Sequence, residues 1–376
     1  HRGVTLQPTT RLYSLFFTIL IFVSEGILAT ETADTIYLGG PIITINDNAP
    51  RAEAVAVANG MILSVGDLDS VMAYKGEGTE IFDLQGNTML PGFVDSHGHA
   101  VMGGLQALSA NLLAPPDGKV KNIASLQDTL RTWMVANNES VELAQLIVGF
   151  GYDQSQLKEL RHPTRHELDA VSTEIPVIIV HQSGHFGVAN SKALQVTGIN
   201  ADSANPPGGI IRKGEDGEPN GVLEENAFFK VLSGLMSGLG EQGLRAFANA
   251  GPRLWARFGY TTAQEGRAAP ATVEAMKKVA AEGGFKIDVV AYPDIMVDRD
   301  YIKENVSRSY TNRMRVGGAK LTIDGSPQGF SAYRDRPYYD PVGEYASFYK
   351  GYAAVTDEQV MDAVDWAFKN NIQILT

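Results

Sequence analysis

The sequence contains no cysteine among its 376 residues. This absence excludes disulfide bonds, metal sites built from thiolates, and a cysteine nucleophile. A serine hydrolase is also disfavoured, because no Gly-x-Ser-x-Gly motif is present and the run Gln182-Ser-Gly-His lacks the strand-to-helix context of a nucleophile elbow. Hydrolytic chemistry, if the chain has any, is therefore expected to use neither a thiol nor a serine elbow.

Positive charge is also scarce, with 31 Lys and Arg against 43 Asp and Glu, which gives a formal net charge of -12. The sequence has no basic block, which argues against nucleic acid and anionic membrane surfaces as partners. With 44% hydrophobic and 20% charged residues, the chain has the composition of a folded protein. We expect two or three structural units.

Two histidines one residue apart end an apolar run that begins at Thr88. If residues 89–94 form a buried strand, its period of two places Asp95, His97 and His99 on one face, with both imidazoles at the carboxyl end. Neutral imidazole is the commonest protein ligand for zinc-like ions. The motif predicts a metal site, although a pair of ordinary surface or core histidines is the alternative.

The segment Leu90-Pro-Gly-Phe-Val-Asp-Ser-His-Gly-His99 resembles the first barrel strand of the amidohydrolase superfamily, whose two histidines hold a catalytic divalent metal. From about Asp34 to Thr376 the chain is most similar to the branch that includes N-substituted formamide deformylase. The resemblance implies an α/β fold, a partial (β/α)8 TIM-type barrel with an N-terminal β-sandwich segment and a large α/β insertion after the first barrel strand. It also implies metal-dependent hydrolysis of a non-peptide C–N bond in a small-molecule substrate. Zinc is the expected ion, with one or two per chain.

The predicted organisation has five parts: a signal peptide over 1–29, a β-sandwich segment over 34–87, a first barrel strand over 88–100, an insertion over 101–250, and barrel strands two to five over 251–376. The apolar run 12–23 is too short for an ordinary membrane span of roughly 20 residues, which favours an exported protein over one anchored by an uncleaved segment. We expect no membrane contact after cleavage and allow for a homodimer.

The insertion carries four of the seven histidines, and His185 is the candidate functional residue among them. It has two interpretations: contact with substrate or a bound oxyanion, or a hydrogen bond that pins the loop. His181 lies on an apolar strand and is expected to be packed, whereas His162 and His166 are expected to face solvent. The glycine-rich segment 208–223 predicts a hairpin that turns at Asp216-Gly217.

Helix and strand patterns alternate from Leu244 onward, as a barrel requires. Strands are predicted over 259–266, 286–292 and 316–326, and a fifth begins at 372. In the third of these, alternation places Lys320, Thr322 and Asp324 on one face, where an unpaired ammonium is costly. The family resemblance implies a carboxylated Lys320 that bridges two metal ions; an ion-paired structural lysine is the alternative.

Other candidate substrate-binding residues lie where these strands end: Gln264, Glu265, Asp324 and Tyr333. Gln264 and Glu265 could instead support the residues that face substrate. Tyr333 opens a loop rich in tyrosine and phenylalanine, which suggests an apolar or aromatic substrate group, with ordinary loop packing as the alternative.

No histidine follows His185, although the family resemblance implies two more histidines on strands five and six and an aspartate on strand eight as general acid and base. The catalytic residue is thus unassigned and expected beyond Thr376. Since both ends look cut, we expect a hydrolase as the complete parent and little activity from these 376 residues. The alternative is a non-catalytic exported binding protein, or a pseudogene product, with the same fold.

Overall fold

The computed structural model describes residues 31–340 and 345–376, so the predicted signal peptide lies outside the described residues. The chain divides into two compact units, of which the first ends at Pro91 and the second begins at Gly92. Within the described ranges, none of the helices combines the length and apolarity that crossing a lipid bilayer requires.

The N-terminal unit is built on a four-stranded sheet in the order β5-β4-β1-β6. The hairpin between β4 and β5 turns at Asn59-Gly60, where both residues have positive φ as a two-residue turn of this kind requires. Ile36, Ala56 and Val71 pack beneath the sheet. The elements are β1 (Thr35–Leu38), β2 (Ile42–Ile43), β3 (Arg51–Ala52), β4 (Ala54–Ala58), β5 (Met61–Gly66), α1 (Leu68–Met72) and β6 (Glu80–Asp83).

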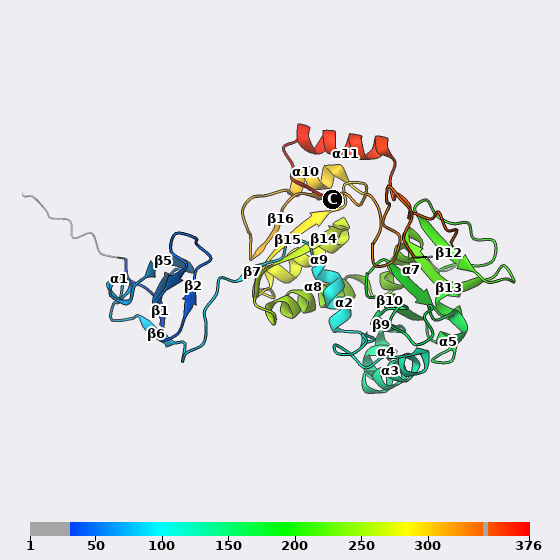
Figure 1. The fold of residues 1–376 in the computed structure, drawn as a ribbon, viewed down its shortest axis with the longest axis horizontal. Coiled ribbons are helices and arrows are strands. Elements are labelled where there is room, and N and C mark those ends of the chain that lie inside the picture. Colours follow the sequence, from blue (N-terminus) through cyan, green and yellow to red (C-terminus); the bar gives the residue numbers. More distant parts are fainter. Residues whose placement is uncertain (1–30, 341–344) are drawn as a thin grey trace, which may run out of the picture. The chain divides into compact units, whose positions relative to one another are not determined.

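A six-stranded sheet, in the order β12-β13-β11-β10-β9-β8, lies at one end of the second unit, to the right of β14 and β15 in Figure 1. Every residue of β9, β10 and β11 is buried, because apolar clusters cover both faces of the sheet. The predicted hairpin is confirmed as the antiparallel pair β12 and β13. The elements are β8 (Ala110–Asn111), α3 (Ile123–Ala136), α4 (Asn138–Ala144), β9 (Ile147–Tyr152), α5 (Arg165–Asp169), β10 (Val177–His181), β11 (Phe186–Ala189), α6 (Ser191–Val196), β12 (Gly209–Lys213), β13 (Pro219–Glu225) and α7 (Asn226–Ser237).

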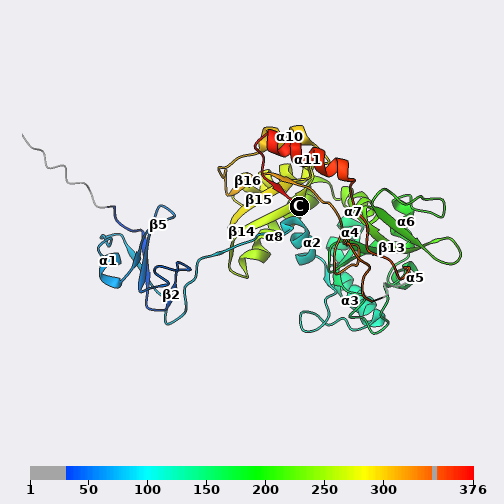
Figure 2. The same cartoon turned by 45° about the horizontal axis from the view of Figure 1, so that its top comes forward.

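The remaining strands of this unit form a parallel sheet in the order β16-β15-β14-β7, and β17 pairs in parallel with β18. Helices α10 and α11 lie side by side (Figures 1 and 2), and their apolar faces pack with β17 and β18. The elements are β7 (Phe93–Val94), α2 (Ala100–Ala107), α8 (Gly240–Ala256), β14 (Tyr260–Ala268), α9 (Pro270–Ala281), β15 (Asp288–Pro293), α10 (Arg299–Asn305), β16 (Met314–Val316), β17 (Ala319–Lys320), α11 (Asp357–Lys369) and β18 (Ile374–Leu375).

Two of the predicted strands differ from the structure. The strand expected over 89–94 is reduced to β7, and its Phe93 and Val94 are exposed because β7 is an edge strand with β14 as its one neighbour. The strand expected over 316–326 is interrupted at Gly317-Gly318 and stops at Lys320. A side chain at Gly318 would overlap the backbone oxygen of Gln373, so the chain approaches its neighbour too closely there for any residue but glycine.

Candidate active site

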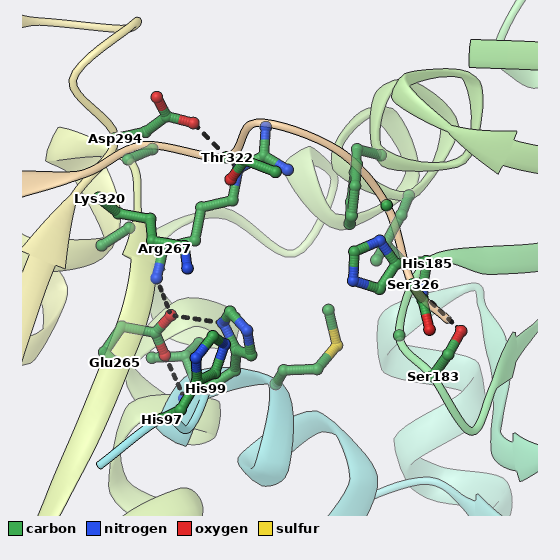
Figure 3. Close-up of a pocket in the computed structure, with 18 of the residues that line it drawn as sticks. His97, His99, Ser183, His185, Glu265, Arg267, Asp294, Lys320, Thr322 and Ser326 are labelled. Atoms are coloured by element: carbon green, nitrogen blue, oxygen red, sulfur yellow. Dashed lines mark hydrogen bonds and ion pairs between the residues drawn. The ribbon is translucent and has the colours of Figure 1, made fainter. Parts of the chain in front are cut away.

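A cavity of about 640 Å³ lies at the carboxyl ends of β14, β15 and β17. It brings together residues that are far apart in the sequence. His97, His99 and Glu265 lie on one side of it, and His185 and Ser183 from the insertion lie on the opposite side (Figure 3). Lys320, Thr322 and Asp324 all line the cavity, but Ile323 and Gly325 line it as well, so the predicted strand alternation does not extend beyond Lys320. Parallel strands with crossover helices place functional side chains at this end of a sheet.

The loop that carries His97 and His99 is held by the carboxylate of Asp95. Asp95 Oδ2 accepts hydrogen bonds from Trp255 Nε1 at 2.7 Å and from the backbone N–H of Gln264 at 3.2 Å. Asp95 Oδ1 accepts from the His97 N–H at 3.2 Å. These contacts tie the loop to α8 and β14, and the two imidazole rings lie 5.8 Å apart between centroids.

Gln264 does not line the cavity, which corrects its prediction as a substrate-binding residue. Its side chain is buried, and its Oε1 accepts from the Gly98 N–H at 3.3 Å. Strand alternation explains the difference, because Gln264 and Glu265 point to opposite faces of β14 and Glu265 alone reaches the cavity. Gln264 instead supports the loop between the two histidines.

Glu265 lines the cavity and also binds the first turn of α2. Its Oε2 accepts from the Val101 N–H at 2.6 Å, which satisfies one of the free donors at the helix N-terminus. Its Oε1 lies 3.9 Å from His99 Nδ1. One oxygen of the Glu265 carboxylate therefore faces the His99 imidazole, while the other accepts a hydrogen bond from the backbone of α2.

Lys320 is the least compensated charge in the cavity. It exposes 6% of its surface and forms an ion pair with none of the carboxylates in the described ranges, whereas neighbouring Arg267 pairs with Asp294 at 2.9 Å. Burial, and after it the positive charge of Arg267, lower the pKa of Lys320, although Asp294 opposes this effect. Burial and the charge of Lys320 also lower the pKa of His97. Both shifts favour the neutral forms of these side chains.

His185 is paired with a carboxylate that the sequence analysis did not single out. His185 Nδ1 lies 2.7 Å from Glu225 Oε2, and Ser331 Oγ donates to the other oxygen of Glu225. Glu225 is buried, with 4% of its surface exposed. The signal available in the sequence was the pair Glu224-Glu225 directly after the apolar Val222-Leu223, since carboxylates that end up buried need partners.

The aromatic loop contributes less to the cavity than predicted. Tyr333 is 57% exposed and does not line the cavity, because its backbone N–H binds Asp324 Oδ2 at 2.9 Å and directs its ring elsewhere. Tyr345 and Tyr352 instead donate to the buried carboxylate of Glu224. Packing therefore accounts for Tyr345 and Tyr352, whereas substrate binding by Tyr333 stays a prediction.

Of the three other histidines in the insertion, two are placed as predicted and one is not. His181 is fully buried and His166 is exposed, as predicted. The prediction for His162 is wrong: its ring stacks on Phe186 at 5.9 Å, its Nδ1 lies 3.0 Å from the Tyr152 hydroxyl, and burial holds its pKa well below the ordinary value.

Within residues 31–340 and 345–376, no group of three or more His, Asp and Glu side chains is arranged to hold a metal ion. The imidazoles of His97 and His99 alone are therefore too few protein ligands for a complete metal site, and Lys320 lines the same cavity.

Comparisons with known proteins agree with this fold. A model of the amidohydrolase family matches residues 80–376. The chain is 28% identical over 278 residues to exoenzymes regulatory protein AepA of Pectobacterium carotovorum subsp. carotovorum, covering 71% of this chain and 57% of that protein. It is 31% identical over 198 residues to N-substituted formamide deformylase of Arthrobacter pascens, covering 53% and 35%. The chain thus spans about half the length of these relatives, or less.

Among solved structures, an uncharacterized metal-dependent hydrolase from Pyrococcus horikoshii OT3 superimposes with a TM-score of 0.65. The match covers 90% of this chain and 64% of that one at 22% identity, which establishes a shared fold. Since the family model covers well over half of the sequence, the chain belongs to the amidohydrolase family.

Proposed function

We propose that this chain is part of a metal-dependent hydrolase that cleaves a non-peptide C–N bond in a small amide or formamide. Family membership supports the reaction class, and the printed name of the formamide deformylase supports the substrate class. The parallel strands β7, β14, β15 and β16, with β17 and β18, are interpreted as strands of a (β/α)8 barrel, and the N-terminal sheet as part of a β-sandwich. Export remains a proposal based on residues 1–29.

The observation that carries the proposal is the buried Lys320, without an ion pair among the described residues, in the cavity that His97 and His99 also line. A buried ammonium without a counter-ion is costly, whereas a lysine carbamate is an anion that suits a cation site. Carbamate formation needs the neutral amine, which the lowered pKa of Lys320 favours. His97 is likewise biased toward the neutral form that binds metal. These donors fit a zinc-like ion held by His97, His99 and carboxylated Lys320.

A bound divalent ion would supply Lewis acidity toward a carbonyl oxygen and would acidify water. The residues of this chain have separate tasks. Asp95 and Gln264 hold the histidine loop, Glu265 faces His99, and Asp324 and His185 line the space left for substrate. Because no histidine follows His185, metal binding is proposed for these residues themselves, and hydrolysis for a protein that supplies the remaining ligands.

Zinc titration by isothermal calorimetry tests the proposal. His97→Ala, His99→Ala and Lys320→Met are each expected to weaken zinc binding by at least about 100-fold, since even the outer partners of metal ligands are worth 10- to 100-fold. His166→Ala, an exposed histidine far from these ligands in the sequence, is the matched control and should bind as wild type does. Equal zinc binding by wild type and the three variants would refute the site.

Labelling with 13C-bicarbonate separates the two roles of Lys320. A carbamate signal that is absent in Lys320→Met is expected in the zinc-loaded protein. If zinc binds without that signal, Lys320 is a structural lysine and the site is a two-histidine site. If zinc does not bind at all, the non-catalytic binding protein becomes the preferred hypothesis.

A further inference from the structure

The insertion presents His185 to the cavity in a fixed orientation. The Ser183 hydroxyl accepts from the His185 N–H at 3.2 Å, and the Glu225 N–H donates to the His185 carbonyl at 2.8 Å. His185 directly precedes β11, and Glu225 is the last residue of β13. The two strands pair with Phe186 opposite Glu224, so His185 and Glu225 are neighbours at the same end of the pair. With both its backbone groups engaged, His185 points its ring from the insertion toward the cavity (Figure 3).

The carboxylate of Glu225 decides which ring nitrogen of His185 carries the proton. One oxygen accepts from Ser331 Oγ, and the other lies 2.7 Å from Nδ1. A carboxylate has acceptors and no donor, so Nδ1 carries a hydrogen and Nε2 is left with a lone pair. Since Nδ1 is engaged by Glu225, Nε2 is the nitrogen available to a molecule in the cavity.

The surroundings of Glu225 hold it in this position. Its backbone has φ of 47°, a conformation that residues with a side chain rarely adopt. Gly325 approaches so closely that a side chain there would overlap Glu225 Oε1 and Ser331 Oγ. Gly325 and Ser331 belong to the segment that follows β17, so the strand that carries Lys320 and the insertion that carries His185 meet at this carboxylate.

We propose that His185 is a catalytic residue that moves a proton through Nε2 and that Glu225 is its positioning residue. This inference rests on the proposed hydrolysis. As water attacks the substrate carbonyl carbon, its proton passes to Nε2, and the resulting imidazolium is stabilised by Glu225. When the C–N bond breaks, the nitrogen keeps the electron pair and takes that proton from Nε2, which restores neutral His185. The insertion thereby places an acid and base group in the wall of the cavity.

Nitrogen-15 NMR of the histidine rings tests the assignment without any turnover. His185 in the wild-type protein is expected to carry its proton on Nδ1. In Glu225→Gln the amide can donate to Nδ1, so the proton is expected to move to Nε2. Glu224→Gln is the matched control, because this neighbouring buried carboxylate binds Arg212 and Tyr345 and leaves His185 alone. A wild-type His185 with its proton on Nε2 overturns the proposal, and this result needs no variant to fold.

Bromoacetamide, a small amide that alkylates a free imidazole nitrogen and releases bromide, tests whether Nε2 is available in the cavity. We expect alkylation of His185 at Nε2 in the wild-type protein and its loss in Glu225→Gln. No alkylation of wild-type His185, or reaction at Nδ1, contradicts the assignment. The exposed His166 reports the intrinsic reactivity of a histidine in the same sample.

Zinc titration of His185→Gln distinguishes this inference from the proposed metal site. Wild-type zinc affinity is expected, since His185 is assigned to proton transfer. Loss of zinc binding in this variant would make His185 a metal ligand and overturn the inference, while the proposed metal site would stand. Absence of zinc binding in the wild-type protein would refute the metal site and, because the proposed step depends on it, the catalytic role of His185.

Discussion

His162 illustrates how a single residue escapes prediction from sequence. Its neighbours Arg161, Pro163 and Arg165 are typical of an exposed loop. In the structure, however, its ring stacks on Phe186 and forms a hydrogen bond with the Tyr152 hydroxyl. Tyr152 lies on β9 and Phe186 on β11, and the sequence around His162 has no pattern that predicts contacts with these strands. Glu225 escapes for the same reason, because its partners His185 and Ser331 lie 40 and 106 residues away in the chain.

The half-buried His162 leads to a prediction about stability and pH. Burial lowers its pKa in the folded protein, whereas the unfolded chain takes up a proton near the ordinary value of about 6.5. The unfolded state therefore binds more protons, so this residue should reduce the free energy of unfolding as pH falls below about 7. Urea unfolding at pH 8 and pH 5.5 should show a smaller pH dependence in His162→Gln than in wild type.

His166→Gln is the control for this comparison, since His166 is exposed. It should retain the pH dependence of the wild-type protein. An unchanged dependence in His162→Gln would show that His162 is not responsible for the loss of stability in acid.

Among the elements, the contact between α2 and α8 decides where the histidine loop lies. Helix α2 begins directly after His99, and the two helices touch through glycine. A side chain at Gly251 would lie 1.7 Å from the Ala100 backbone oxygen, and one at Gly104 would lie 1.9 Å from that of Phe247. The backbones are therefore in contact, which fixes the start of α2 against α8.

Gly251→Ala should force α2 away from α8. We expect a loss of about 1–3 kcal/mol in the free energy of unfolding, the usual cost of overpacking, together with weaker zinc binding because His99 moves. Gly234→Ala within α7 is the matched control, since its side chain would make ordinary contact with Thr197 and helix propensity should add about 1 kcal/mol of stability. Urea unfolding of both variants is the measurement, and equal effects would contradict this account of the helix pair.

Elements with a clear periodic pattern could be predicted from the sequence. Elements whose ends are determined by contacts with distant segments of the chain could not. The apolar runs that became β9 and β10, and the hairpin at Asp216-Gly217, are in the predicted places because their local pattern and their burial agree. The strand through Lys320 reads as continuous in sequence but breaks at Gly317-Gly318, where close approach of another strand decides the backbone. Beyond Lys320 the chain is not a strand, and consecutive residues from Thr322 onward line the cavity instead of alternate ones.

For the whole molecule, the central claim is that strands distant in sequence meet to form one metal site. His97 and His99 follow β7, Lys320 ends β17, and the cavity between them is also bounded by the insertion. The sequence identified these three residues through a family resemblance and could not supply their distances. Nor could it supply the partner of Glu225, which acts on the cavity through its contact with His185.

Anomalous diffraction at the zinc absorption edge, from crystals of this chain grown with zinc, tests the claim most directly. The account predicts an anomalous peak inside the cavity, in contact with the imidazoles of His97 and His99 and on the side of Lys320. A peak at His166 or another surface position, with none in the cavity, would contradict it.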